Sequence, residues 1–184
     1  MIIKKEFYNR SSLMVAQELL GSILVRKIGN KIYRTRIVET EAYEGFHDKA
    51  SHASRGKTAR NEVMFGKAGI AYVYFTYGMH FMLNIVTGPE EYPAAVLIRA
   101  VEPQDINIQN TNGPARLTKA LKIDKTFNGF SVYTKKHGLW IEIGENMKNK
   151  DIISAKRIGV DYAGEYKDKL WRFYIKDNEF VSKK

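Results

Sequence analysis

The sequence contains no cysteine, which excludes disulfide bonds and thiolate-bound zinc. It also lacks repeats and low-complexity tracts. No apolar run approaches the length of roughly 18 residues that a membrane-spanning helix needs. The N-terminus has two lysines but no apolar run behind them, so it does not read as a signal peptide. We therefore expect one domain over residues 1–184, without membrane association, located in the cytoplasm and at the nucleoid if the source is bacterial.

Several chemistry-bearing motifs are missing as well. Neither GxxxxGK[ST] nor GxGxxG occurs, so a nucleotide cofactor has no support, and there is no HExxH, no GxSxG and no cysteine nucleophile. His47 and His52 flank Asp48, but no recognisable further ligands accompany them. The spacings of helix-turn-helix and zinc-finger proteins are also missing. We expect neither a metal nor a cofactor.

Acidic residues are in short supply. Against 30 Lys and Arg stand 20 Asp and Glu, giving a formal net charge of +10 and a pI near 9.6. Such an excess favours a polyanionic partner, either a nucleic acid or an anionic membrane surface. Hydrophobic residues make up 44% of the chain, which is enough for a packed core.

The periodicity predicts an α+β fold, a mainly antiparallel curled β-sheet with a few helices. Ser11 or Ser12 caps a short helix that stops at Gly21, and Pro114 begins another that runs to Lys122. Hairpin turns are expected at Gly29-Asn30 and Tyr77-Gly78. The expected strands cover residues 22–28, 31–43, 70–76, 79–87, 94–101, 130–134, 139–143, 151–160 and 171–175. The last four residues are expected to fray.

The stretch RIVETEAY, residues 36–43, organises the rest of the chain. Strand periodicity places Glu39, Glu41 and Tyr43 on one face. Either the carboxylates face solvent and pair with Arg34 and Arg36, or they are buried and used, because an ionised carboxylate is costly to bury otherwise. Arg99 interrupts a later apolar strand and needs a carboxylate partner, for which Glu39 and Glu41 are both candidates.

The loop at residues 44–69 and the expected hairpin tip at Tyr77 fit an enzyme that acts on a base inside a duplex. The loop at residues 44–69 lacks periodicity but carries His52, five basic residues and two apolar anchors, Met64 and Phe65. Tyr77 would project from a hairpin tip, where an aromatic ring has no role in folding. An enzyme that acts on a base inside a duplex must extrude it, hold it between rings and fill the gap. Tyr43, Tyr74 and His52 would line such a pocket, Tyr77 would be the wedge and Glu41 would activate water.

In its motifs the chain resembles the alkyladenine (3-methyladenine, methylpurine) DNA glycosylase family. The matching segments are ETEAY at 39–43, DKASHASRGKTARN at 48–61, MFGKAG at 64–69, YVYFTYGMHFMLN at 72–84, LIRAVEP at 97–103, GPARLTKAL at 113–121, RIGVDYAGEY at 157–166 and WRFYI at 171–175. This resemblance covers nearly the whole chain. It implies a fold like the C-terminal domain of formyltransferases.

The resemblance also implies roles for particular residues. Glu41 matches the general base and Arg99 the arginine that holds the attacking water. Tyr43, His52 and Tyr74 match the residues that sandwich and hydrogen-bond the flipped base. Tyr77 matches the residue that intercalates in the minor groove, Asn84 the asparagine that disfavours guanine, and the backbone near Val160 completes the water site.

The implied function is excision of alkylated or deaminated purines from double-stranded DNA, of the 3-methyladenine, 7-methylguanine, hypoxanthine and ethenoadenine class. The enzyme would act as a monomer and leave an abasic site. No lysine occupies a matched pocket position, so strand cleavage through a Schiff base is not expected. Two alternatives are a nonenzymatic module that binds damaged DNA or RNA, and a formyl- or acyltransferase, which rests on fold analogy alone.

Overall fold

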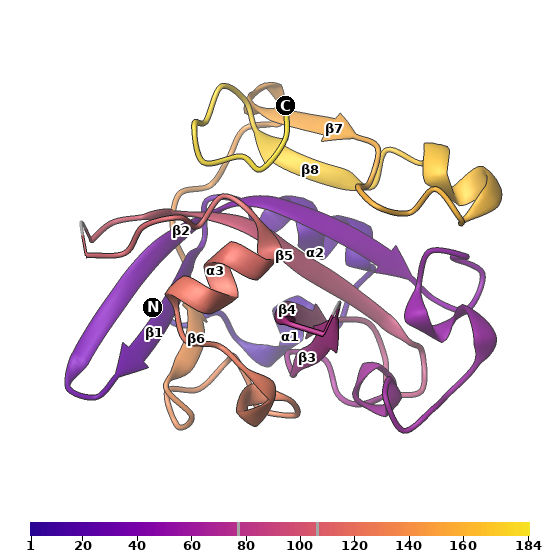
Figure 1. Ribbon diagram of the computed structural model, residues 1–184, viewed down its shortest axis with the longest axis horizontal. Coiled ribbons are helices and arrows are strands. Elements are labelled where there is room, and N and C mark those ends of the chain that lie inside the picture. Colours follow the sequence, from indigo (N-terminus) through magenta and orange to yellow (C-terminus); the bar gives the residue numbers. More distant parts are fainter. Residues whose placement is uncertain (77, 106) are drawn as a thin grey trace.

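The computed structural model describes residues 1–76, 78–105 and 107–184. In this part of the chain one curled sheet of eight strands is combined with three α-helices, which confirms the predicted α+β class (Figure 1). The helices are α1 (Lys5–Tyr8), α2 (Ser12–Glu18) and α3 (Pro114–Ala120). The strands are β1 (Ile23–Ile28), β2 (Lys31–Glu44), β3 (Ala71–Thr76), β4 (His80–Val86), β5 (Ala94–Pro103), β6 (Leu139–Glu142), β7 (Ile152–Ala155) and β8 (Arg172–Ile175).

Strand β2 is the centre of the sheet. The strand order is β3-β4-β5-β2-β1-β6, and all of these pairs are antiparallel. One edge of β2 pairs with β1 along its first half and with β8 along its second half, while β5 pairs with the other edge. The expected turn at Gly29-Asn30 joins β1 to β2, and the register places Ile28 opposite Lys31. RIVETEAY therefore has hydrogen-bonded neighbours on both edges, as a rigid support for side chains requires.

The two faces of β2 have different neighbours. Helix α2, which Ser11 caps by accepting a hydrogen bond from the Leu13 N–H, packs on one face. On that face the Thr40 hydroxyl donates to the Ala16 carbonyl over 2.8 Å. Val38 and Ala42 belong to the main core there. Because side chains alternate along a strand, Glu39 and Glu41 project from the opposite face.

The pairing of β2 with β5 is locally irregular. Ile37 lies opposite Val101 and Thr40 opposite Ile98, which is one continuous register, yet Glu39 lies opposite Ala100 between them. Two shifts therefore cancel within a few residues, and Val38 and Arg99 have no partner in the register. Such bulges are frequent beside active sites, where they re-aim a side chain.

Four predictions about local structure are corrected. Residues 130–134 form no strand; Ser131 makes a single bridge to Ile70, and Val132 donates to the Gly69 carbonyl and accepts from the Ile141 N–H, so that this segment links β3 to β6. The strand expected at 151–160 ends at Ala155, and α1 was not expected. The chain end is held rather than frayed, since Val181 is buried and Ser182 makes hydrogen bonds.

The loop after β2 is anchored as predicted. Met64 and Phe65 are buried in a small cluster with Ala53 and Tyr72, and the loop contains two 3₁₀ turns, His52–Arg55 and Glu62–Phe65. Gly45 begins the loop with a φ of +70°, and a Cβ there would lie 2.4 Å from the Tyr92 hydroxyl. Only glycine suits this turn. Within the described residues no helix has the length and apolarity needed to cross a membrane.

Candidate active site

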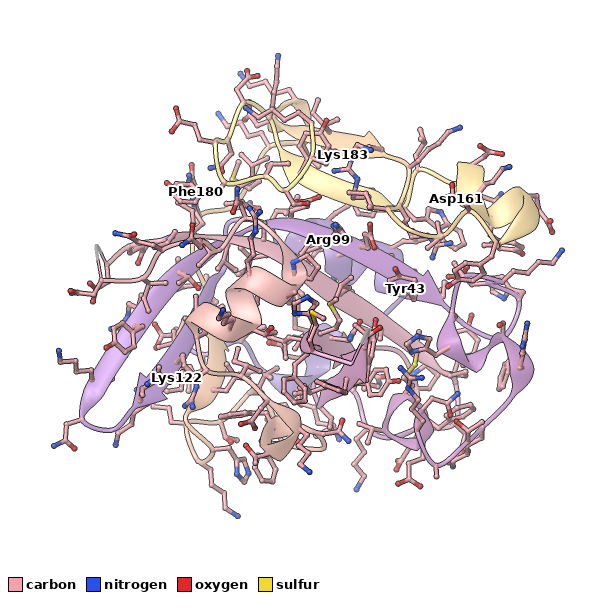
Figure 2. The ribbon with its side chains drawn as sticks, in the orientation of Figure 1. Tyr43, Arg99, Lys122, Asp161, Phe180 and Lys183 are labelled. Atoms are coloured by element: carbon pink, nitrogen blue, oxygen red, sulfur yellow. The ribbon has the colours of Figure 1, made fainter. Side chains whose placement is uncertain are left out.

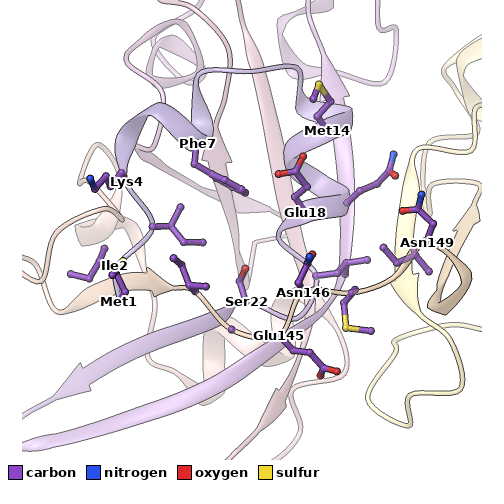
Figure 3. A pocket seen from close by; sticks show the side chains of 17 residues that line it. Met1, Ile2, Lys4, Phe7, Met14, Glu18, Ser22, Glu145, Asn146 and Asn149 are labelled. Carbon is purple, nitrogen blue, oxygen red and sulfur yellow. The ribbon is translucent and has the colours of Figure 1, made fainter.

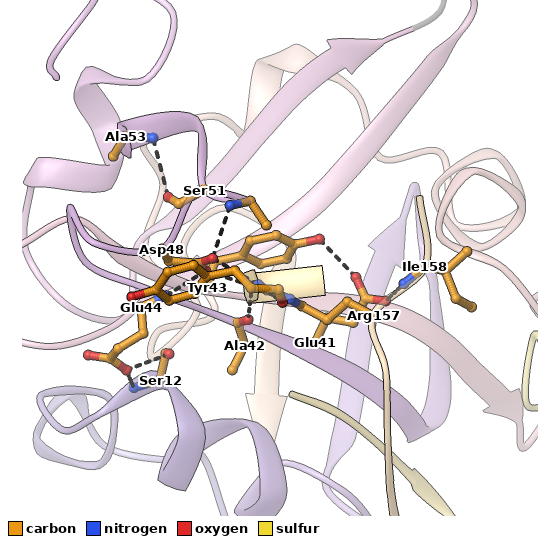
Figure 4. Close-up of polar contacts among 12 residues, drawn as sticks. Ser12, Glu41, Ala42, Tyr43, Glu44, Asp48, Ser51, Ala53, Arg157 and Ile158 are labelled. Carbon is orange, nitrogen blue, oxygen red and sulfur yellow. Dashed lines mark hydrogen bonds and ion pairs between the residues drawn. The ribbon is translucent and has the colours of Figure 1, made fainter. Parts of the chain in front are cut away.

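Glu41 is fully buried and has three partners, and Figure 4 shows its hydrogen bonds with Tyr43 and Ile158. Its Oε1 accepts from the Ile158 backbone N–H at 2.8 Å and is ion-paired with Arg99 Nη1 at 3.2 Å. Its Oε2 accepts from the Tyr43 hydroxyl at 2.8 Å. An ionised carboxylate has about four acceptor positions, so one remains for a further donor such as water. Burial, and next the negative charge of Glu41, raise the pKa of Tyr43 well above its ordinary value, which keeps the phenol protonated as a donor.

Each of these three partners also lines a cavity of about 180 Å³. This volume is below the roughly 300–1,000 Å³ of drug-sized ligand sites, so the cavity suits one ring system rather than a whole cofactor. The cavity is rich in aromatic side chains. The residues that line it are Tyr43, Ala50, His52, Met64, Tyr72, Tyr74, Thr76, Met82, Asn84, Ala95, Leu97, Arg99, Pro114, Ile158, Gly159, Val160 and Tyr162. Figure 2 shows Tyr43 and Arg99 on the neighbouring strands β2 and β5.

One row of residues across the sheet connects the cavity wall to Glu41. Tyr72 on β3 lies opposite Asn84 on β4, and Asn84 lies opposite Leu97 on β5. Leu97 lies opposite Glu41 on β2. Side chains opposite each other in an antiparallel pair share a face. The sheet therefore brings together on one face residues that the sequence separates by more than 50 positions.

His52 and two tyrosines form an aromatic wall of the cavity. The His52 and Tyr74 rings meet edge-on with centroids 4.5 Å apart, and His52 Nδ1 lies 3.1 Å from the Tyr72 hydroxyl. Burial, with a smaller contribution from the charge of Arg60, lowers the pKa of His52. Burial raises the pKa of Tyr72 to about 12 and that of Tyr74 further still. At neutral pH the wall is uncharged, as a stacking surface for an aromatic base requires.

The other residues named from the sequence lie here too, with one exception. The buried Asn84 donates its amide N–H to the Tyr72 carbonyl at 3.2 Å, and Val160 is buried in the wall. The backbone N–H that reaches Glu41 belongs to Ile158, two residues before Val160. Tyr77 lies outside the described residues.

A buried ion pair fixes the two loops that flank Glu41. Arg157 donates to both carboxylate oxygens of Asp48, at 2.6 and 2.8 Å, and to the Ala42 carbonyl. Its guanidinium lies over the rings of Tyr43 and Trp171, 4.8 and 5.0 Å from their centroids. Arg157 therefore orients the Tyr43 ring in the wall of the cavity. No role for Arg157 or Asp48 was predicted from the sequence, where both stand in motifs of the resemblance and Asp48 was otherwise noted only for its place between His47 and His52.

Glu39 and Glu41 do not face solvent, which excludes the alternative of surface pairing. Arg36 pairs instead with Glu102 and Glu145, and Arg34 with Glu142. Arg99 contacts both candidate partners, through Nε to Glu39 at 3.3 Å and through Nη1 to Glu41. Although burial alone lowers the pKa of Arg99, the charges of Glu41 and Glu39 raise it above the usual value, so the guanidinium stays charged.

A larger cavity, of about 780 Å³, lies elsewhere (Figure 3). The N-terminal segment, α2 and the segment after β6 line it, and its labelled side chains include Met1, Phe7, Met14, Glu18, Glu145 and Asn149. It contains none of the predicted site residues. The acids in its lining are ion-paired, Glu18 with Arg10 and Glu145 with Arg36. Its size therefore does not make it the reactive centre. Among the described residues, no group of His, Cys, Asp and Glu is placed to hold a metal.

A buried carboxylate beside an aromatic cavity the size of one ring system, on a strongly basic protein, defines a class of enzyme. The class is that of the DNA glycosylases, which hydrolyse the bond between a base and its sugar. The chain belongs to the methylpurine-DNA glycosylase family, whose model matches residues 6–179.

Similar proteins cover the whole chain. A relative from Desulfitobacterium hafniense, provisionally named 3-methyladenine DNA glycosylase, is 46% identical over 201 residues, with 98% of each chain covered. Relatives with the same provisional name from Clostridium botulinum and Carboxydothermus hydrogenoformans are 46% and 47% identical, each with 100% of both chains covered. This chain is accordingly a DNA repair glycosylase that acts on DNA.

Proposed function

We propose that the protein excises damaged purines by direct hydrolysis, with Glu41 as the general base and no covalent enzyme–DNA intermediate. The observation that carries this proposal is that all three partners of Glu41, namely Tyr43, Arg99 and Ile158, also line the aromatic cavity. Glu39 is equally buried, but of its partners Arg99, Arg172 and Ser182 only Arg99 lines the cavity. Glu41 does not itself line the cavity, but all three of its partners do, so of the two buried carboxylates we propose Glu41 as the one nearer to a reacting sugar.

The proposed reaction uses this geometry. Once a purine is flipped, it occupies the cavity among Tyr43, His52 and Tyr74, and its sugar lies at the mouth. Water in the fourth acceptor position of Glu41 loses its proton to the carboxylate as it attacks the sugar carbon, and the base leaves with the bonding electron pair. The negative charge of Glu41 also stabilises the positive charge that develops on the sugar.

The lining of the cavity supports a monofunctional reaction. Among the described residues that form it there is no lysine, so no amine is placed to form a Schiff base with the sugar and cleave the strand. A lesion with a cationic ring, such as a 3-methylpurine, is already a good leaving group. For substrates we propose alkylated and deaminated purines, including 7-methylguanine, hypoxanthine and ethenoadenine, and for the acting species a monomer.

The test is incubation with duplexes that each carry one of these lesions, followed by alkali to convert abasic sites into breaks. We expect base release from one or more lesion duplexes, little release from the undamaged duplex, and breaks only after alkali. A duplex retained without base release would indicate a binding module. Breaks before alkali would indicate a lyase and would exclude the water mechanism.

A further inference from the structure

The chain end is built into the support of the candidate active site. The Ser182 backbone N–H donates to Glu39 Oε2 at 2.7 Å. The Ser182 hydroxyl accepts from Arg99 Nη2 at 3.4 Å. The carbonyl of Lys183 accepts from Arg172 Nη1 at 2.8 Å. Figure 2 shows Phe180 and Lys183 beside β8 and above the strand that carries Arg99.

These contacts converge on one buried, charge-balanced group. Glu39 accepts from Arg172 and Arg99 through Oε1, and through Oε2 from the Ser182 N–H of the C-terminal tail, by which we mean residues 182–183. Arg99 in turn reaches Glu41 through its remaining nitrogen, Nη1. Two carboxylates and two guanidinium groups thus neutralise each other, and the tail supplies the uncharged donor and acceptors that complete them. A buried network of this kind has one arrangement only if every member is satisfied.

Arg99 is held at three nitrogens, and each contact has a different origin. Nε is fixed by Glu39, Nη1 by Glu41 and Nη2 by Ser182. A planar guanidinium held in this way cannot rotate about its last bonds. Without the tail, one nitrogen of Arg99 and one oxygen of Glu39 lose their partners, and water takes their place. The Glu39 carboxylate can then turn, and Arg99 turns with it.

We infer that residues 182–183 are positioning residues for catalysis, which hold Arg99 and through it Glu41 in the geometry that the reaction needs. This inference rests on the proposed function of Glu41. The tail lines no part of the cavity among the described residues, so it should affect the rate of base release and not the binding of the lesion. Displacements of about 1 Å in a reacting group cost as much as about 100-fold in rate.

The experiment compares a chain that ends at Val181 with a control chain that lacks only Lys184, which makes none of these contacts. Single-turnover excision and the Kd for a lesion duplex are measured for both. We expect excision about 10- to 100-fold slower without residues 182–184, with Kd changed less than about 3-fold, and a control close to the full chain. Excision at the full rate by the chain ending at Val181 would overturn the inference.

A second pair of variants works even if the shortened chain folds poorly. Ser182→Ala removes the hydroxyl that Arg99 contacts but keeps the N–H, and Ser182→Thr keeps both. We expect a loss of a few-fold for alanine and none for threonine. Equal rates for the two would show that the Ser182 hydroxyl does not hold Arg99, and would overturn the inference.

The route through Arg99 is tested by repeating the truncation in an Arg99→Gln background. If the tail acts through Arg99, the truncation there should change the rate by less than about 2-fold, because coupled residues are not additive. An undiminished effect would mean that the tail only stabilises the fold, and would overturn the inference.

The NMR signal of the Arg99 Nε–H gives a readout that does not depend on activity. We expect a slowly exchanging signal in the full chain and a lost or rapidly exchanging one after truncation at Val181. If the full chain released no base from any lesion, the proposed function would fail, yet this signal would still decide whether the tail holds Arg99.

Discussion

Replacing Glu41 by glutamine is the sharpest perturbation of the proposed mechanism, because the structure indicates that the amide fits. The side-chain carbonyl would take the place of Oε1 and accept from the Ile158 N–H and from Arg99. The amide nitrogen would replace Oε2 opposite the Tyr43 hydroxyl, which can reverse and accept. Shape and hydrogen bonds are kept, and only the charge and the basicity are lost.

The size of the effect follows from what is removed. A positioned general base contributes about 10²- to 10⁴-fold to a rate, and the lost charge no longer stabilises the cationic sugar, so we expect a loss of that order or more. Arg99 keeps Glu39 as a partner at 3.3 Å, but Arg172 shares that carboxylate, so the buried group is left with one excess positive charge and its thermal stability should fall. Because Glu39 still contacts both guanidinium groups, the fold and the affinity for a lesion duplex should persist.

The assay is single-turnover excision of one lesion, with Kd and thermal stability measured on the same samples. Glu44→Gln is the matched control, since Glu44 receives hydrogen bonds from Ser11 and Ser12 at the start of α2 and does not line the cavity. We expect the control to excise at nearly the full rate even if its stability falls. Near-normal excision by Glu41→Gln would refute the role of Glu41.

Three further predictions concern the wall and rim of the cavity. Asn84→Ser should open room in the cavity for the 2-amino group of guanine, and should raise the release of undamaged guanine relative to that of adenine lesions. Both rates are measured on matched duplexes. Unchanged guanine release with intact lesion release would mean that Asn84 has another role. Because burial lowers the pKa of His52, its ring stays neutral below the ordinary value of about 6.5, so affinity for a cationic lesion should hold at pH 6.5 and fall only at lower pH as His52 gains its proton. In His52→Gln that fall should be missing from the pH profile of Kd, and its persistence would assign it to another group. Arg60 is exposed, and its charge acts to lower the pKa of His52 and of two tyrosines of the wall, Tyr72 and Tyr74. Arg60→Gln should therefore weaken non-specific DNA binding and reduce the slope of log affinity against log salt by about one. An unchanged slope would exclude a phosphate contact.

Local patterns predicted the elements well, because they depend on neighbouring residues. The alternation of Glu39, Glu41 and Tyr43 predicted β2, and the turn at Gly29-Asn30 placed β1 before it. The strand predicted at residues 130–134 is wrong. This segment has the composition of a strand, but only Ser131 forms a β-bridge, to Ile70.

Long-range contacts were predicted only in part. Arg99 required a carboxylate, and the sequence offered Glu39 and Glu41 without a way to choose; the structure uses both. The pairing of Asp48 with Arg157 joins residues 109 positions apart, and neither stands out in its own segment. The last residues were expected to fray because chain ends usually do, whereas Ser182 is held by a carboxylate that only the folded sheet brings near it.

The register of the sheet explains why the site and the core cannot be separated. Tyr72, Asn84, Leu97 and Glu41 form one row only if three strand pairs are each in the observed register. A slip of one residue in any pair would turn that strand's polar residues toward the face where α2 and the main core lie, and would expose the apolar residues that now fill it. The apolar alternation that drives folding therefore also fixes the position of the candidate base. A sheet that buries its core correctly places Glu41 against Tyr43, Arg99 and Ile158, which line the cavity, and this coupling lets two carboxylates remain in the buried half of a central strand.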